Sequence, residues 1–312
     1  ELAALQDAEG ALTEPAAAAL RRAVFRRGVA PDARAEAWPL LLGVFPPGST
    51  RAERQRSLEE KRQQYAAHRE AGERLAEDPE FKDGSVIVHD VHRTQASHPR
   101  HEHHKPAMTE VLRAYAALDG EVGYGQGMSD MLAVLLYALE DAALSFWCFV
   151  ALLRGSGCSS GLRGDDARRL HLAKDVTDTA SAVLGRLARL LELVTPELHG
   201  HVVACECAEL LFCYPWVKML LKRELPFEEV PRLWEACWCA PAALADQDQS
   251  EDFVLCCCAA ILQRRQKELL KGKSLETFFT ALRNVQVSAA ELVRDGELLC
   301  QAASAAAHSS PG

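Results

Sequence analysis

The sequence lacks the excess of basic residues that proteins bound to nucleic acid usually carry. Its 312 residues include 35 Lys and Arg against 44 Asp and Glu, which gives a formal net charge of −9 at pH 7. Because nucleic-acid binding normally needs a positively charged face, we expect no nucleic acid among its partners. Hydrophobic residues make up 48% and charged residues 25% of the chain, a composition typical of a folded globular protein of one domain or two lobes.

The sequence also lacks the spaced cysteine framework of a small secreted protein. Its eleven cysteines sit in hydrophobic, helix-like runs such as 205–207 and 256–258, and no secretory signal follows Glu1. We therefore expect reduced, buried thiols in a cytoplasmic protein. The chain does not begin with methionine, so we expect it to be part of a longer one. Membrane contact would then be indirect, through a partner or through regions outside this sequence.

One hydrophobic run, at 131–153, is long enough to be considered as a membrane span. Glu140 and Asp141 lie near its centre, and an acidic side chain at that depth costs on the order of 3 kcal/mol on insertion. We expect no transmembrane segment and predict instead two buried helices with a break near these two residues.

Strand-like alternation of β-branched residues is almost absent. Ala, Leu, Glu and Arg dominate, and apolar side chains recur every three or four residues, as in 183–194. This pattern predicts an all-α fold. The expected organisation is a helical lead-in at 1–22, a first lobe at 23–160, a second lobe at 161–306 and a disordered tail at 307–312. The Gly- and Ser-rich stretch around 155–166 marks the lobe boundary.

Histidines cluster between Thr94 and Lys105, a segment that we predict to be a loop, with a helix following from Ala107. His89 and His92 stand three apart on a predicted helix just before it. Zinc needs three or four ligands in a defined geometry. A loop offers no helical register to hold the clustered histidines, and the cysteines are distant in sequence, so we expect polar loop residues and no metal site.

Two glycine-rich stretches resemble phosphate-binding loops without meeting their requirements. Gly123, Gly125 and Gly127 alternate with other residues, but no strand is predicted before them, as a dinucleotide-binding turn would need. Gly272-Lys273-Ser274 lacks the upstream glycine of a Walker A loop, because position 267 is Lys. No nucleophile–base arrangement stands out either. We expect the chain to have no nucleotide or other cofactor of its own.

Two short stretches remain, at 87–94 and 122–128. In the first, Asp90 and Arg93 at i and i+3 can pair on one helix face, with Ile87 on the same face. In the second, Gln126 stands between two glycines. An arginine and a glutamine held in place suit charge stabilisation and water orientation at a phosphate held by another protein. Taken singly, the first could be a surface salt bridge and the second a helix start. The occurrence of both stretches in one chain is what favours action on a phosphate held by another protein.

With these residues in view, the sequence resembles the TBC-domain family of Rab GTPase-activating proteins. Four ordered blocks between about 23 and 282 carry the resemblance. Ile87-x-x-Asp90-x-x-Arg93-Thr94 is similar to the family's arginine-finger motif. Tyr124-x-Gln126-Gly127-Met128, preceded by Val122-Gly123, is similar to its glutamine-finger motif. The other blocks are an opening turn and a later segment, with the residues Gly28, Arg34, Trp38, Arg232 and Trp234, which we expect to support the fold.

The resemblance implies an all-α, two-lobed, V-shaped domain that stimulates GTP hydrolysis by a GTP-bound Rab and so regulates membrane trafficking. The Rab would carry GTP and Mg²⁺. Arg93 would neutralise negative charge on the phosphates of that GTP, and Gln126 would orient the attacking water. Supplying the arginine in trans is typically worth about 10³–10⁵ in rate. The supporting residues would be Ile87, Asp90, Thr94, Tyr124, Gly125, Gly127 and Met128.

The sequence departs from the family pattern at Gly125, where many members have cysteine, and at 97–101, which lacks an aromatic residue common after the proline. These departures bear on which Rab is recognised. The second hypothesis is a non-catalytic Rab-binding effector or scaffold on the same fold. A purely structural helical-repeat adaptor would leave both motifs unexplained.

Overall fold

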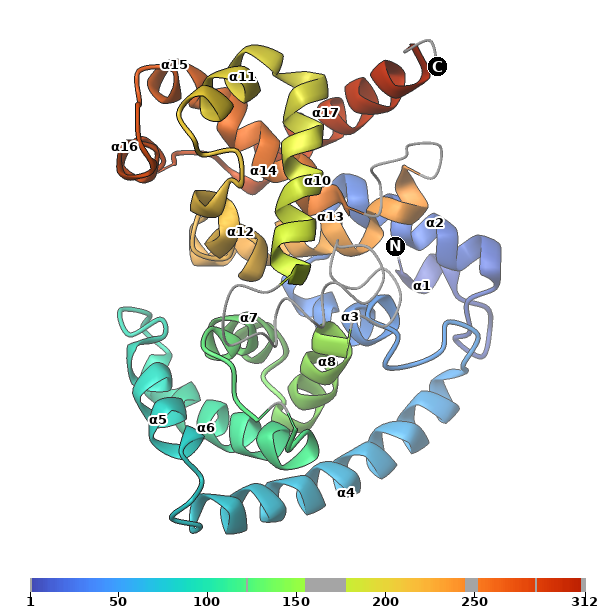
Figure 1. Cartoon of the computed structure of the whole chain (residues 1–312). Coiled ribbons are helices and arrows are strands. Elements are labelled where there is room, and N and C mark those ends of the chain that lie inside the picture. The colour runs from blue at the N-terminus through green and yellow to red at the C-terminus, as the bar shows by residue number, and fades with distance from the viewer. Residues whose placement is uncertain (1, 122, 155–177, 245–251, 284, 310–312) are drawn as a thin grey trace. The chain divides into compact units, whose positions relative to one another are not determined.

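The computed structural model describes residues 2–121, 123–154, 178–244, 252–283 and 285–309 (Figure 1). The regular elements of these residues are all helices, which confirms the expected all-α fold. The described chain divides into two compact units, one of residues 2–23 and 29–154 and the other of residues 24–28 and 178–309. The V-shaped arrangement of two lobes stays a prediction.

The described part of the first unit contains seven complete α-helices and most of α2, which passes into the second unit at its last turn. The elements in chain order are α1 (Leu2–Leu5), α2 (Glu14–Arg27), the 3-10 turn η1 (Pro31–Ala33), α3 (Arg34–Leu41), α4 (Arg51–Ala76), α5 (Asp83–Arg93), α6 (His101–Leu118), α7 (Met128–Leu139) and α8 (Ala142–Arg154). The long, charged α4 packs on α6 and α8.

A capping box starts α4. The Thr50 hydroxyl accepts a hydrogen bond from the backbone N–H of Glu53 at 3.2 Å, and the Glu53 carboxylate accepts one from the Thr50 N–H at 2.8 Å. Two of the unpaired donors at the helix start are satisfied in this way. Farther along, the indole N–H of Trp147 on α8 donates to the Lys61 carbonyl at 2.9 Å and ties α8 to the middle of α4.

The hydrophobic run at 131–153 forms two helices, as predicted. α7 ends at Leu139, Glu140 takes a left-handed conformation with φ of +53°, and Asp141 accepts from the Leu144 N–H at 2.8 Å at the start of α8. The two acidic residues therefore stand at the break between two buried helices. Among the described residues, no helix is long and apolar enough to cross a membrane.

The predicted histidine-rich loop was wrong at its C-terminal end, because α6 begins at His101 and not at Ala107. His101 and His104 are buried, and the His104 ring packs on the Tyr137 ring of α7 at 4.2 Å between centroids. Burial, reinforced by the nearby Arg100, lowers the pKa of His104 to about 4, so the imidazole is neutral at pH 7. Within the described ranges, no three His, Cys, Asp or Glu side chains are placed to hold a metal ion.

The second unit is also built from helices. They are α10 (Asp178–Val194), α11 (Pro196–Ala204), η2 (Leu211–Cys213), α12 (Tyr214–Lys218), η3 (Phe227–Glu229), α13 (Val230–Ala243), α14 (Phe253–Arg264), α15 (Gln266–Leu269), α16 (Leu275–Ala281) and α17 (Ala289–Ser309). α17 continues to Ser309, so residues 307–309 are helical where a disordered tail was expected. The alanine-rich sequence before Ser309 favours that extension.

The core of the second unit is rich in thiols. Cys256, Cys257 and Cys258 of α14 are fully buried, with Cys237 of α13 and Cys300 of α17. None of the ten described cysteines forms a disulfide. The expectation of buried thiols holds for eight of them, whereas two, at 205 and 207, are half-exposed. Burial raises the pKa of Cys213 and Cys258 well above the ordinary value, which keeps these thiols protonated and unreactive.

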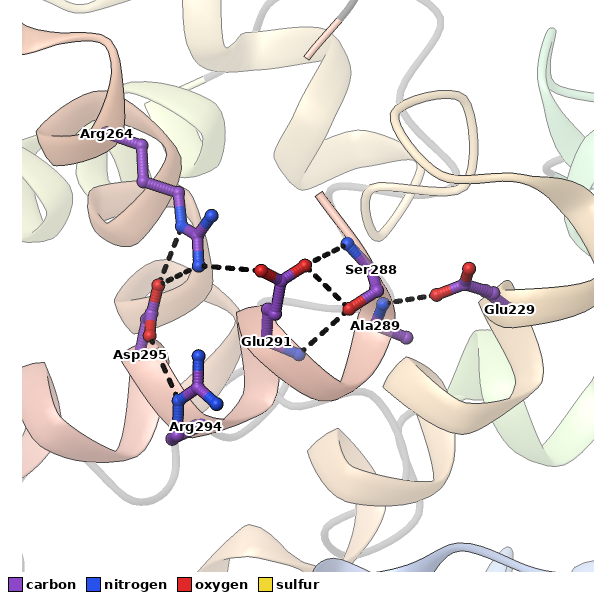
Figure 2. A network of polar contacts seen from close by, with 7 residues as sticks. All are labelled: Glu229, Arg264, Ser288, Ala289, Glu291, Arg294 and Asp295. Carbon is purple, nitrogen blue, oxygen red and sulfur yellow. Dashed lines mark hydrogen bonds and ion pairs between the residues drawn. The ribbon is translucent and has the colours of Figure 1, made fainter. Parts of the chain in front are cut away.

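Polar contacts hold the start of α17 against its neighbours (Figure 2). Ser288 donates its N–H and hydroxyl to the Glu291 carboxylate at 3.0 and 2.7 Å, and Glu229 accepts from the first N–H of α17 at 2.5 Å. One turn later, Arg264 of α14 pairs with Asp295 at 2.6 Å. These groups are partly exposed, so their ion pairs are screened by water and set the position of α17 more than its stability.

Two of the sequence blocks meet inside the second unit. Arg232 on α13 donates through Nη2 to the carbonyls of Phe25 and Arg26, at 2.8 and 3.2 Å, and so caps the last turn of α2. Gly28 follows with φ of +73°, and a Cβ there would lie 2.7 Å from Arg232 Cδ. The neighbouring Trp234 is fully buried and donates to the Leu220 carbonyl at 3.0 Å. Gly28, Arg232 and Trp234 are structural residues.

The contact between Gly28 and Arg232 predicts the effect of Gly28→Ala. Alanine would meet both a left-handed backbone and a steric clash, so the free energy of unfolding should fall by roughly 3 kcal/mol. Gly43→Ala is the matched control, because Gly43 has φ of +76° and nothing within 4 Å of the added Cβ. It should cost only the backbone term of roughly 1–2 kcal/mol. Urea unfolding followed by circular dichroism measures both, and equal losses would contradict the steric argument.

Candidate functional site

The first motif occupies the last two turns of α5. Ile87 and Val91 are 0% and 1% exposed and form the inner face of the helix, together with the buried Asp90. Arg93 is the final residue of α5, and half of its side chain is exposed. One face of the helix is therefore anchored in the core, while Arg93 at the C-terminal end of the helix is presented to solvent.

The Asp90 carboxylate is the centre of the site. Its Oδ1 accepts from Arg93 Nε at 3.1 Å and from Nη2 at 2.7 Å, and its Oδ2 accepts from the Tyr124 hydroxyl at 2.8 Å. Both oxygens of this buried acid are thus satisfied, which offsets the cost of removing its charge from water. Nη1 of Arg93 takes no part in the pair with Asp90.

The second motif is a tight turn that leads into α7. Gly127 stands immediately before the helix with φ of +103°, a conformation that glycine adopts without strain. The Gly125 N–H donates to the sulfur of the buried Met128 at 3.2 Å. Gln126 is exposed between these buried glycines. Gln126 lies two residues before the first residue of the twelve-residue helix α7, and the N-terminal end of a helix carries partial positive charge.

Two further contacts join the motifs. The Tyr124 N–H donates to Asp83 Oδ2 at 2.9 Å, from the start of α5. The hydroxyls of Thr94 and Ser129 lie 2.9 Å apart in a buried contact between the end of α5 and the first turn of α7. The turn and the helix are therefore connected at both ends of α5.

The structure brings together the residues that the two motifs singled out. These are Ile87, Asp90, Arg93, Thr94, Tyr124, Gly125, Gln126, Gly127 and Met128. Val122 lies outside the described residues. Arg34 and Trp38 lie on α3, with the guanidinium 5.6 Å from the centre of the buried indole. Asp83 and Ser129 were missed by the sequence reasoning, because a turn aspartate and a helix-start serine carry no signal of a partner 41 or 35 residues away.

The chemistry available here is electrostatic. An arginine held along one edge and an exposed amide can stabilise negative charge and orient water, and neither is a nucleophile. Burial raises the pKa of Tyr124, and the neighbouring Asp90 carboxylate raises it further, although the Ser129 hydroxyl opposes the shift. The Tyr124 hydroxyl is therefore protonated at neutral pH and remains a donor to Asp90.

The raised pKa predicts a pH dependence of stability. A phenol whose pKa is higher in the folded state than its unfolded value of about 10 stabilises the fold below that pH, and the contribution is lost as the pH rises above it. Tyr124→Phe should lower the free energy of unfolding by about 1–2 kcal/mol at pH 7. The gap from wild type should shrink between pH 10 and 11 in urea unfolding. A gap that is constant up to pH 11 would contradict the assignment.

Comparison with known proteins identifies the fold family. Residues 31–270 match the Rab-GTPase-TBC domain family, RabGAP-TBC. TBC1 domain family member 16 of Homo sapiens is 31% identical over 231 residues, which are 70% of this chain and 28% of that protein. GTPase-activating protein gyp7 of Schizosaccharomyces pombe is 28% identical over 305 residues, 89% of this chain and 37% of that protein. The chain thus spans about a third of the length of these curated relatives.

Two solved structures share the fold. The Ypt/Rab-GAP domain of Gyp1p has a TM-score of 0.71 at 18% identity and covers 98% of this chain and 96% of that one. The Chlamydomonas flagellar RabGAP TBC domain has a TM-score of 0.62 at 20% identity and covers 90% of this chain and 82% of that one. Because the family match takes in well over half of the sequence, the chain belongs to the Rab-GTPase-TBC domain family.

Proposed function

We propose that this domain accelerates GTP hydrolysis by a Rab-family GTPase in its GTP-bound state. The observation that carries the proposal is the buried Asp90 carboxylate, which joins the motif with the exposed Arg93 to the turn that presents Gln126. Membership of the Rab-GTPase-TBC domain family and the name of the relative gyp7, a GTPase-activating protein, support the same function.

Arg93 is proposed to act as an arginine finger. Its Nε and Nη2 are held by Asp90, which orients the guanidinium before the partner arrives. The exposed half of the side chain is then available to the phosphates of GTP, which the Rab binds together with Mg²⁺. A cation placed there stabilises charge that develops during phosphoryl transfer and does not need to reorganise during the reaction.

Gln126 is proposed to orient the attacking water. A carboxamide both donates and accepts hydrogen bonds, so it can align a water with respect to a phosphate. Gly127 supplies the left-handed backbone of the turn that leaves Gln126 exposed, and Tyr124 fixes the turn to Asp90. GTP and Mg²⁺ belong to the partner in this mechanism. The domain is proposed to work in the cytoplasm, with access to membranes through its partner or other regions, and to regulate membrane trafficking.

Single-turnover GTP hydrolysis by a panel of GTP-loaded Rabs tests the two fingers. Wild type should accelerate one or more Rabs. Arg93→Ala should lose about 10³-fold or more of that acceleration, and Gln126→Ala should also lose most of it. Arg74→Ala, an exposed arginine in the last turn of α4, is the control and should behave as wild type. A wild-type domain that binds a Rab without stimulating hydrolysis would identify a non-catalytic effector instead.

Asp90→Asn tests the positioning of Arg93. The amide oxygen can still accept from Arg93, and the amide NH2 can donate to the Tyr124 hydroxyl, but the carboxylate charge is gone. The charge-assisted pair with Arg93 becomes a weaker, neutral hydrogen bond, so the arginine is less well oriented. We expect kcat to fall about 10-fold to 100-fold, with KM changed less than threefold. Glu102→Gln is the matched control, because Glu102 forms an exposed i, i+3 pair with Lys105. A fully active, stably folded Asp90→Asn variant would exclude this role.

A further inference from the structure

Two cysteines just beyond the end of α11 differ from the others. Cys205 and Cys207 are partly exposed, whereas the other eight cysteines that the structure describes are buried. A single residue, Glu206, separates them. Cysteines that respond to oxidants are typically open to solvent and have a second cysteine next to them. We call Cys205 and Cys207 the thiol pair, and the proposed function makes no use of it.

The turn that closes α11 holds the thiol pair close together. Glu206 takes a left-handed conformation with φ of +57°. Its N–H donates to the Val203 carbonyl and the Cys207 N–H donates to the Val202 carbonyl, both at 3.0 Å. This pattern of bonds is a common way to end a helix, and it turns the chain so that Cα atoms two residues apart lie about 5–6 Å from each other. Disulfides usually join Cα atoms within roughly 4.4–6.8 Å, so the backbone spacing fits a bond between the pair.

The Cys207 side chain folds back toward its neighbour. Its Sγ lies 3.3 Å from the carbonyl oxygen of Cys205. Burial raises the pKa of the Cys207 thiol, and the neighbouring charges of Cys205 and Glu206 raise it further. Cys207 is therefore a protonated thiol at neutral pH, and it is held beside Cys205 as a second reactant for that sulfur.

A histidine one turn earlier on α11 lies next to the first sulfur. His201 Nε2 lies 2.8 Å from the Gly272 carbonyl oxygen and 3.8 Å from Cys205 Sγ. A carbonyl oxygen only accepts hydrogen bonds, so Nε2 carries the proton and offers an N–H to both atoms. The thiolate is the form of cysteine that attacks an oxidant, and a hydrogen-bond donor beside the sulfur favours that form. Of the two sulfurs, Cys205 is thus the one placed to react first.

We propose that the thiol pair is an oxidation site at which hydrogen peroxide converts Cys205 and Cys207 into a reversible disulfide. The Cys205 thiolate attacks one peroxide oxygen and the O–O bond breaks, which gives a sulfenic acid and a hydroxide ion that takes up the proton lost by the thiol. The Cys207 sulfur then attacks the Cys205 sulfur, and the sulfenic oxygen leaves as water with the Cys207 proton. The two thiols lose two electrons and two protons, and the peroxide is reduced to two molecules of water. A thiol reductant reverses the reaction by exchange.

Oxidation of the pair changes a contact between α11 and a later segment. Cys205 Sγ lies 3.8 Å from the Gly272 carbonyl oxygen, to which its S–H donates. A disulfide has no S–H, so the carbonyl loses this donor. Gly272 stands two residues before Ser274, the N-cap of α16. The oxidation state of the pair is thereby coupled to the contact between α11 and the chain that leads into α16.

Peroxide treatment followed by alkylation and mass spectrometry tests the proposal. The folded wild-type chain should lose two alkylatable thiols and show a link between Cys205 and Cys207 in its peptide map, and dithiothreitol should restore both thiols. Cys207→Ser lacks the second thiol, so its Cys205 should stop at a sulfenic acid that dimedone traps. Absence of the link in peroxide-treated wild type, or a link from either sulfur to another cysteine, would overturn the proposal.

Two histidine variants test the first step. His201→Phe keeps a ring but removes the N–H beside Cys205, so the disulfide should form about tenfold more slowly. His199→Phe, in a half-buried residue of the same helix, is the matched control and should oxidise at the wild-type rate. Circular dichroism should show both variants folded. Equal rates in all three proteins would overturn the role of His201. These measurements need no Rab, so their outcome is independent of the proposed function.

Discussion

The site depends on one buried carboxylate. Asp90 has an arginine on one oxygen and a tyrosine hydroxyl on the other, and these two partners come from different motifs of the chain. A buried acid with unmet hydrogen bonds would be strongly destabilising. The requirement to satisfy Asp90 therefore fixes both the direction of Arg93 and the position of the turn that holds Gln126. Orientation of the two exposed side chains and stability of the first unit have the same physical source.

A parallel arrangement organises the second unit around Arg232. Its side chain is partly buried, and this burial lowers its pKa, although the neighbouring Glu235 acts in the opposite direction. The carbonyls at the end of α2 accept from it, and the absence of a side chain at Gly28 makes room for its stem. In both units, a charged side chain connects segments that are far apart in sequence. In the first it is the buried Asp90, which holds a cation at the surface, whereas in the second it is the partly buried cation of Arg232 itself.

The division between inner and outer faces explains how α5 is anchored in the core while Arg93 stays exposed. Its buried side chains and Asp90 connect it to α6, α7 and the Tyr124 turn, so the helix has little freedom to rotate. Its outer face is consequently presented in one orientation. The proposed function of Arg93 needs this property, because a side chain that must be ordered when the partner binds reduces the binding energy available for the transition state.

Much of this could be predicted from sequence alone. The three- and four-residue spacing of apolar side chains determined the helical fold, and the acids at 140 and 141 determined the break between α7 and α8, because helix periodicity and the cost of a buried charge are local properties. The spacing of Asp90 and Arg93 likewise determined that they can pair.

Tertiary packing decided the rest. It placed Asp83 and Ser129 against the second motif, brought Gly28 to Arg232, and started α6 at His101 by packing His104 on Tyr137. These contacts join residues separated by tens or hundreds of positions, and no local pattern records which distant backbone or ring will satisfy a given side chain.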